Sequence, residues 1–415
     1  MQLTQRAYPT ALAALLLLMP LGTARAGDGL EEHRSLNRKD GDSLEAKTEA
    51  PIGTRVAGKL VVYEDNDGLT VVTPIVSVTQ KIFDTTSLTA EYDADVLTAA
   101  TVDVRTAATQ KFEEVRHGLA VSATHRLRDL ETDLNGSVSL SREADYASAT
   151  FGGGISSDFL DKNFTLGGGY SYVLNAVGRS HTPYDNFLDR LHIHALSVSA
   201  TQLLSPQAYL QISGSGIGAF GYQGSVYRYV PLFLEGQVEE SQVDETNLES
   251  GAVRPLLRPA EQVPRERWRG AIVARLNYAF DFGLTLAPDY RFYADSWGIT
   301  SHTFDLVAHQ HLPAGLVLRA RSRFYAQQAA TFYQRVYLIE SVDVLPLHYT
   351  TDRELGTYWY ELVGLKLSWE LPNFGAFESL VLDIKGDLQY TRYADFAFLP
   401  SRTAFMLGGG FVVEL

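Results

Sequence analysis

Charged side chains recur at every second position in several stretches of this sequence. Arg319, Arg321 and Arg323 alternate with smaller or apolar residues. Successive side chains of an extended strand point to opposite faces, so such a stretch needs one wet and one apolar environment. The charges can set the ionic selectivity of a channel, or they can form salt bridges between neighbouring strands. Their mixed signs favour the salt-bridge network slightly, and the two roles are compatible if a gap remains between the charges.

Two histidine pairs are candidates for chemistry. His309 and His311 share one strand face with Asp305. A His with a carboxylate can activate water or a serine hydroxyl, which makes these three residues the catalytic candidates of an outer-membrane hydrolase. No G-x-S-x-G nucleophile elbow in a strand-to-helix context supports that chemistry, so we favour a hydrogen-bonded polar pair and predict no enzyme. His192 and His194 resemble a metal pair but have no third ligand at suggestive spacing, so we predict no metal site.

A tandem repeat occupies residues 95–101 and 103–109, with the common form Asp-x-x-Thr-Ala-Ala-Thr. It is similar to the acceptor sequence of flavin transferases, which attach FMN to the final threonine through a phosphoester. That resemblance implies Thr101 and Thr109 as acceptor hydroxyls, although an alanine stands where the acceptor usually has a glycine. We favour an Ala/Thr-rich loop or strand end and expect no cofactor, since short motifs often match by chance.

The elements that must position these residues are long strands of period two. The alternating stretches run for ten or more residues, longer than the five or six of a soluble strand and sufficient for a tilted membrane strand. We predict about sixteen strands near residues 56–64, 69–82, 86–96, 114–128, 133–142, 146–160, 163–174, 189–204, 207–223, 267–281, 283–297, 301–312, 315–329, 357–371, 376–391 and 402–415. An even count returns both termini to the same side of the membrane.

The connections between these strands are of two kinds. Several are short, whereas those near 97–113, 175–188, 224–266 and 330–356 are long. Short periplasmic turns opposite long outer loops are typical of outer-membrane barrels, and closure leaves no strand edge in lipid. We therefore predict an all-β fold, a transmembrane antiparallel up-and-down β-barrel. The 224–266 loop should be the largest outer loop and the best protease target on intact cells.

A barrel assigns a direction to the alternating charges. An Arg that faces lipid at the mid-plane costs about 2–4 kcal/mol, so the charges should face the lumen. Besides the three hydrolase candidates, the expected lumen-facing residues are Arg269, Arg275, Asp289, Arg291, Asp295, Arg319, Arg321, Arg323, Lys366, Glu370, Asp383, Lys385 and Asp387.

Composition excludes several other classes of protein. The chain has 22 Tyr, 20 Phe and 34 Gly but no Cys, which rules out a disulfide scaffold, Fe–S clusters, c-type haem and thiolate zinc. A net charge of −14 argues against a nucleic-acid partner. Trp268, Trp297, Trp359 and Trp369 fall near predicted strand ends, where amphipathic rings favour the membrane interface.

The two ends of the chain indicate export and membrane insertion. Residues 1–26 have the charged, apolar and small-x-small regions of a signal peptide, and residues 27–51 are too polar to order as anything but a flexible periplasmic arm. The barrel would then occupy residues 52–415. Alternating apolar residues in the final strand resemble the signal read by the barrel-insertion machinery, although Leu415 stands where that signal usually has an aromatic residue.

Three stretches carry a family resemblance: 61–78 (VVYEDNDGLTVVTPIVSV), 289–303 (DYRFYADSWGITSHT) and 319–333 (RARSRFYAQQAATFY). They resemble an uncharacterised bacterial outer-membrane β-barrel family known as domain of unknown function 3570. The resemblance implies a barrel in the outer membrane of a Gram-negative bacterium and supplies no established activity. We expect a channel, or a barrel component of an envelope system, with outer-membrane lipid and the insertion machinery as partners and a small solute as possible cargo. A flavin-bearing barrel in envelope electron transfer and an outer-membrane hydrolase are the alternatives.

Overall fold

The computed structural model describes residues 53–99, 112–179, 182–372 and 377–415. The predicted signal peptide (1–26) and periplasmic arm (27–51) lie outside the described residues. None of the helices in the described part of the chain is long and apolar enough to cross a membrane.

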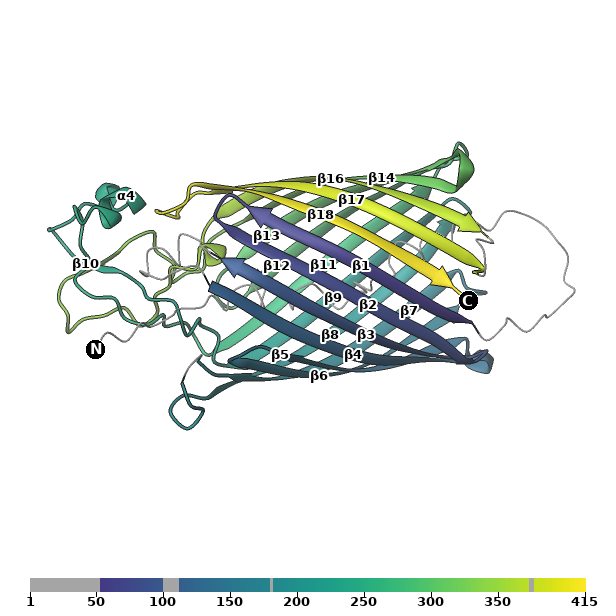
Figure 1. The fold of residues 1–415 in the computed structure, drawn as a ribbon, viewed down its shortest axis with the longest axis horizontal. Coiled ribbons are helices and arrows are strands. Elements are labelled where there is room, and N and C mark those ends of the chain that lie inside the picture. The colour runs from purple at the N-terminus through teal and green to yellow at the C-terminus, as the bar shows by residue number, and fades with distance from the viewer. Residues whose placement is uncertain (1–52, 100–111, 180–181, 373–376) are drawn as a thin grey trace, which may run out of the picture.

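Sixteen long strands form a closed barrel, in which every strand pairs antiparallel with both neighbours (Figure 1). Strands β1 and β18 close it, from Arg55 opposite Glu414 to Asp65 opposite Ala404. The strands are β1 Thr54–Asp65, β2 Leu69–Phe83, β3 Thr86–Ala99, β4 Phe112–Leu127, β5 Thr132–Arg142, β6 Tyr146–Phe159, β7 Phe164–Val177, β8 Asp189–Ser205, β9 Ala208–Gly221, β11 Glu266–Ala279, β12 Leu284–Asp295, β13 Thr300–Leu312, β14 Leu316–Gln327, β16 Tyr358–Pro372, β17 Ser379–Tyr393 and β18 Ser401–Glu414. The predicted fold and strand count are confirmed.

The alternating pattern in the sequence corresponds to the two faces of the barrel wall: apolar residues point outward and the residues between them point inward. In β13, Phe304 and Leu306 are 54% and 46% exposed, whereas Asp305 between them is 6% exposed. The same rule holds around the wall, and the exposed apolar side chains form one continuous outer surface that a bilayer must cover. The inner face carries the polar side chains.

The two ends of the barrel differ. At one end lie the start of β1, the end of β18 and the turns that include the 3-10 helices η1 Arg128–Leu130 and η3 Pro313–Gly315. The other end bears long loops, which fold into a cap with β10 Leu232–Leu234, η2 Glu240–Gln242, α4 Glu245–Glu249, β15 Tyr337–Ile339 and η4 Arg353–Leu355. Strands β10 and β15 pair in parallel, joining two loops that are about a hundred residues apart in sequence.

Two hairpins at the cap end use the same local chemistry. The Asp65 carboxylate accepts hydrogen bonds from the backbone N–H of Asp67 and Leu69, and Asp295 accepts the equivalent pair from residues 297 and 299. Each turn then needs a left-handed residue, supplied by Gly68 (φ 81°) and Gly298 (φ 89°). The two strings quoted above that contain Tyr-x-Asp-x-x-Gly are therefore two copies of one turn.

Three of the four tryptophans lie on the outer surface near strand ends, as expected. Trp268, Trp359 and Trp369 are 58%, 36% and 43% exposed. The prediction for Trp297 was wrong, because this residue is 4% exposed. Trp297 lies in the turn after β12, where its ring folds inward beneath the Arg267 guanidinium, 4.2 Å from the ring centroid.

Candidate functional site

The inner face of β1, β11–β14 and β16–β18 is densely charged, and we call it the charged wall. The structure places all thirteen predicted lumen residues on this face, since each is flanked in its strand by outward side chains. Its cations are Arg55, Lys59, Arg267, Arg269, Arg275, Arg291, Arg319, Arg321, Arg323, Lys366, Lys385 and Arg402. Its carboxylates are Asp65, Asp289, Asp295, Asp305, Glu370, Asp383, Asp387 and Glu414. The cations outnumber the carboxylates, so this wall leans positive.

Individual carboxylates on the charged wall are shared between cations of neighbouring strands. Asp305 of β13 accepts from Arg321 at 2.6 Å and from Arg323 Nε at 2.8 Å, both on β14. Asp295 binds Arg267 at 2.5 Å and accepts from the Tyr293 hydroxyl at 2.8 Å. The arginine–carboxylate bonds cross from strand to strand, and therefore stiffen the wall as well as neutralising part of its charge, whereas the Tyr293 bond lies within β12.

A basic row crosses four consecutive strands at one level of the charged wall. The register places His309 opposite Arg319, Arg319 opposite Lys366, and Lys366 opposite Lys385. Lys366 lies 3.6 Å from Asp383 and Lys385 lies 3.2 Å from Asp387, so two carboxylates serve the row from adjacent levels.

Some guanidinium groups of this wall keep unused donors. The Nε atoms of Arg269 and Arg291 are buried from solvent and have no hydrogen-bond partner within the described residues. A buried donor without an acceptor is costly, and no described side chain relieves that cost at these two positions.

The inner face of β5–β9, which we call the small-residue wall, has a different composition. Ser197, for example, lies between the outward Leu196 and Val198, which are 58% and 55% exposed. Most inner residues here are serine, glycine, threonine or asparagine, among them Asn135, Ser137, Ser139, Thr150, Gly152, Gly154, Ser156, Gly167, Gly169, Ser197, Ser199, Ser213 and Ser215. The charged inner residues of these five strands are Asp133, Asp158 and Asp189, all near strand ends.

Short side chains leave space beside the small-residue wall. Asn135 and Ser137 point inward and are nonetheless exposed, so the barrel interior is open to a water-sized molecule next to them. The long arginine and lysine side chains of the charged wall point toward the same interior. The interior therefore has a mainly basic side on the charged wall and a side of short polar residues on the small-residue wall. Between them, β3 and β4 add the inward carboxylates Glu91, Asp93 and Asp95, and Arg116 binds the last two.

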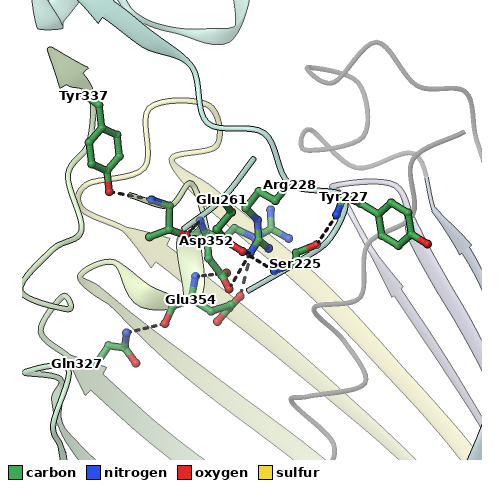
Figure 2. Close-up of polar contacts among 10 residues, drawn as sticks. Ser225, Tyr227, Arg228, Glu261, Gln327, Tyr337, Asp352 and Glu354 are labelled. Carbon is green, nitrogen blue, oxygen red and sulfur yellow. Dashed lines mark hydrogen bonds and ion pairs between the residues drawn. The ribbon is translucent and has the colours of Figure 1, made fainter. Parts of the chain in front are cut away.

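The cap is held together by a buried carboxylate. Glu261, with a side chain 1% exposed, accepts from the Ser225 backbone N–H at 2.5 Å and from Arg228 at 3.0 Å, and also binds the Thr350 hydroxyl (Figure 2). Arg228 in turn lies 3.1 Å from Asp352. Glu261 thereby ties the loop after β9 to the loop after β14.

The cap is also fastened to the barrel rim. Arg353 binds Asp67 in the β1–β2 turn at 2.5 Å, and Gln327 at the end of β14 donates to the Gly356 carbonyl at 2.7 Å. Apolar clusters add to these polar contacts, including Val230, Leu232, Tyr337, Ile339 and Tyr349. Burial raises the pKa of Tyr337, whose hydroxyl donates to the Phe332 carbonyl and accepts from the backbone N–H of Thr350. The cap is therefore a folded element.

The three hydrolase candidates lie on the inner face of β13, but they are too far apart for a catalytic pair. His309 lies four residue steps along β13 from Asp305, about 13 Å at 3.3 Å per residue. The Asp305 carboxylate is instead engaged by two arginines. A direct Asp–His hydrogen bond, which would orient the base in a hydrolase, is out of reach in this geometry.

The flavin-acceptor candidates Thr101 and Thr109 lie outside the described residues, so that expectation stands as an expectation. The first aspartate of the repeat does lie in the structure. Asp95 is part of β3, which extends to Ala99 rather than 96, and its carboxylate accepts from the Thr73 hydroxyl and from Arg116 at 2.7 Å. Asp95 is thus a wall residue with partners on both neighbouring strands.

The histidines of β8 point outward rather than into a site. The Nδ1 atoms of His192 and His194 each lie 2.7 Å from a tyrosine hydroxyl, those of Tyr172 and Tyr170. Within the described residues, no group of three or more His, Cys, Asp or Glu side chains has the arrangement of a metal site.

Three residues of functional interest were missed by the sequence analysis. Lys59 and Arg267 each stand next to an outward apolar side chain, Leu60 and Trp268, and must therefore face inward. The alternation could have found both. Glu261 lies in a loop without periodicity, and no local pattern distinguishes it from its exposed acidic neighbours.

The closed antiparallel barrel, with an apolar outer surface, a polar interior and a cap at one end, defines a transmembrane β-barrel of the outer-membrane class. A model of the family described as protein of unknown function (DUF3570) matches residues 104–190 and 179–383. The chain belongs to this family.

Solved structures with a similar fold are outer-membrane proteins. The CymD monoaromatic hydrocarbon channel is 10% identical, with 88% of this chain and 90% of that chain covered and a TM-score of 0.41. A bacterial polysaccharide outer membrane secretin is 9% identical, with coverage of 88% and 98% and a TM-score of 0.44. CdiB from Acinetobacter baumannii is 8% identical, with coverage of 87% and 60% and a TM-score of 0.49. A search of curated proteins found no match.

Proposed function

We propose that this protein is a diffusion channel of the outer membrane that favours small anionic solutes. The observation that carries the proposal is the contrast between the charged wall, where cations outnumber carboxylates, and the small-residue wall, whose three inward aspartates are each bound by an arginine. In the basic row, Arg319, Lys366 and Lys385 bring three cations to neighbouring strands at matched register positions.

The geometry suits weak, multi-site binding, which permeation requires. Many cations of the charged wall are already paired with a carboxylate, so no single position would hold an anion tightly. In outer-membrane barrels the long loops face the exterior, so solutes would enter past the cap and leave at the end that carries the start of β1 and the end of β18.

Planar-bilayer recordings across a potassium chloride gradient test the proposal. We expect a zero-current potential whose sign shows that chloride is more permeant than potassium. The preference for chloride should be larger at low ionic strength, where exposed charges are less screened. The triple variant Arg319→Gln/Lys366→Gln/Lys385→Gln should shift the permeability ratio toward potassium. Arg392→Gln is the matched control, because Arg392 is exposed on the outer side of β17 near the rim.

Two results would contradict the proposal: a wild-type channel that prefers potassium, or a triple variant with unchanged selectivity. Unboiled samples of every variant should migrate as folded barrels, so that a change in selectivity is not confused with loss of the fold.

A further inference from the structure

A groove of about 580 Å³ lies on the outer surface of the barrel, at the cap end of β3–β8. Its volume falls within the roughly 300–1,000 Å³ of small-molecule sites. The large side chains that border it are apolar and exposed, among them Leu119, Leu140 and Leu174. The floor of the groove is low in the middle because three outward positions hold the short side chain of alanine, at residues 147, 149 and 176.

One row of outward residues crosses the groove at its cap-end rim. The register pairs His117 with Arg142, Arg142 with Ala147, Ala147 with Ala176, and Ala176 with Arg190. Two arginines therefore flank two alanines. Three strand-to-strand steps separate the arginine backbones, about 14 Å, so both side chains can reach a group seated over the alanines.

The side chains of both arginines are available to a ligand. Within the described residues, the side chains of Arg142 and Arg190 have no ion pair and no hydrogen bond, and both are exposed. The neighbouring Asp189 is occupied by Arg265, with two bonds of 2.9 and 2.7 Å. In a chain of net charge −14, this leaves a local positive patch beside an apolar groove on a surface that faces lipid.

Aromatic–histidine pairs border the groove on either side. The Tyr92 hydroxyl lies 2.8 Å from His117 Nδ1, and the Tyr172 hydroxyl lies 2.7 Å from His192 Nδ1. Tyrosine is typical of the level at which lipid headgroups meet acyl chains. The groove thus begins at the headgroup level and extends toward the mid-plane.

We propose that this groove binds one acyl chain of a phosphorylated glycolipid of the outer leaflet, with its phosphate held by Arg142 and Arg190. Guanidinium groups bind phosphate through paired N–H···O bonds, and the alanines leave room for the chain below. The outer leaflet is the source because the long loops of such barrels face the exterior and the groove lies at their end. This site is independent of the proposed channel.

The outer surface on the opposite side of the barrel has large rings where the groove has alanines, which supports a specific lipid site at the groove. There the outward cap-end positions of β11–β14, β16 and β17 hold large rings, including Trp268, Phe292, Phe324, Trp359 and Tyr390, which fill the same level. Phe220 packs on Trp268 with ring centroids 5.2 Å apart, and Phe324 lies 6.3 Å from Trp359. The gap over the alanines lies on β6 and β7.

Native mass spectrometry tests the proposal on the full chain released from bilayer discs of phosphatidylcholine that contain diphosphorylated lipid A. We expect the wild type to retain one lipid A molecule. Arg142→Gln/Arg190→Gln should reduce the retained fraction about tenfold or more. Ala147→Leu/Ala176→Leu, which fills the groove and keeps both charges, should do the same. Arg392→Gln, which removes an outward cap-end charge far from the groove, should retain lipid A as the wild type does.

Three outcomes would overturn the proposal: equal retention in all four proteins, retention of phosphatidylcholine as strong as that of lipid A, or equal retention of phosphatidylglycerol in discs that contain it. The last would make the occupant any anionic lipid rather than a glycolipid. Channel conductance should be unchanged in both double variants, so that failure of this proposal is distinguishable from failure of the channel proposal.

Discussion

The two inner walls of this barrel share one fold and one alternating pattern, yet they are built on different chemistry. The charged wall is held by ion pairs that cross between strands, such as the two arginines on Asp305. The small-residue wall has short, neutral side chains, and inward residues such as Ser137 remain exposed. The difference teaches that one backbone ladder accommodates two inner faces of different chemistry, one stabilised by ion pairs between strands and one lined by short polar side chains.

Removing one carboxylate from the charged wall should have the largest effect on the stability of the barrel. Asp305→Asn leaves Arg321 and Arg323 close together without their shared anion, and breaking a buried pair in this way costs about 3–5 kcal/mol. Ser199→Ala on the small-residue wall is the matched control and should change stability by less than about 0.5 kcal/mol. Denaturant unfolding in detergent micelles measures both. Equal midpoints for the two variants would show that the ion pairs do not stabilise the charged wall.

The cap joins the two walls, and Glu261 is the residue on which we expect it to depend. Glu261→Ala leaves the Ser225 N–H and the Thr350 hydroxyl without their acceptor, at about 1–3 kcal/mol. Cap opening should therefore rise by roughly 5- to 140-fold. The measurement is the rate at which a protease added to intact cells cleaves the 224–266 loop. Glu235→Ala, on the exposed surface of the cap, should leave that rate unchanged.

This test also refines the expectation that the 224–266 loop is the best protease target. The loop holds fully buried residues such as Val230 and Leu232, so its cleavage requires local opening. A wild-type cap cleaved as fast as the Glu261→Ala variant would show that the cap is already open in the membrane.

The smallest effect concerns pH and is confined to the turn between β5 and β6 in the small-residue wall. Burial, with Asp145 nearby, raises the pKa of Glu143 from 4.5 to about 7. The Glu143 carboxyl binds its proton more tightly in the folded turn than in the unfolded chain. The stability of the turn is therefore greatest at pH values below the ordinary pKa of 4.5, and it is lost as the pH rises through about 7. Amide exchange at the turn, corrected for intrinsic rates, should be slower near pH 5 than near pH 8 in the wild type. Glu143→Gln should remove the difference, and a difference that persists would assign it to another group.

The sequence predicted the barrel because the wall obeys a local rule. Each strand must present apolar residues outward and polar residues inward, and this alternation is readable without knowledge of the partner strands. All sixteen predicted strands correspond to observed ones, and the inward charges follow from parity. Strand ends were less well predicted, since β7 continues through Asn175, a polar residue that is buried on the inner face.

The cap and the pairing of charges could not be predicted in the same way. Strands β10 and β15 have three residues each and meet only through contacts distant in sequence. The partners of Asp305 depend on the register between β13 and β14, which alternation does not fix. Trp297 was misplaced because proximity to a strand end does not determine which way a turn residue folds.

Chemical labelling of the small-residue wall tests the central claim most directly, since the natural chain has no cysteine. Ser197→Cys places a single thiol on the inner face, and Val198→Cys places one on the outer surface. Anionic and cationic methanethiosulfonate reagents of similar size would be added to the protein in a bilayer during conductance recording. We expect the anionic reagent to modify Ser197→Cys faster and to lower its conductance, with no effect of either reagent on Val198→Cys. Faster modification by the cationic reagent, or no modification of Ser197→Cys from water, would contradict an open, anion-favouring passage between the two walls.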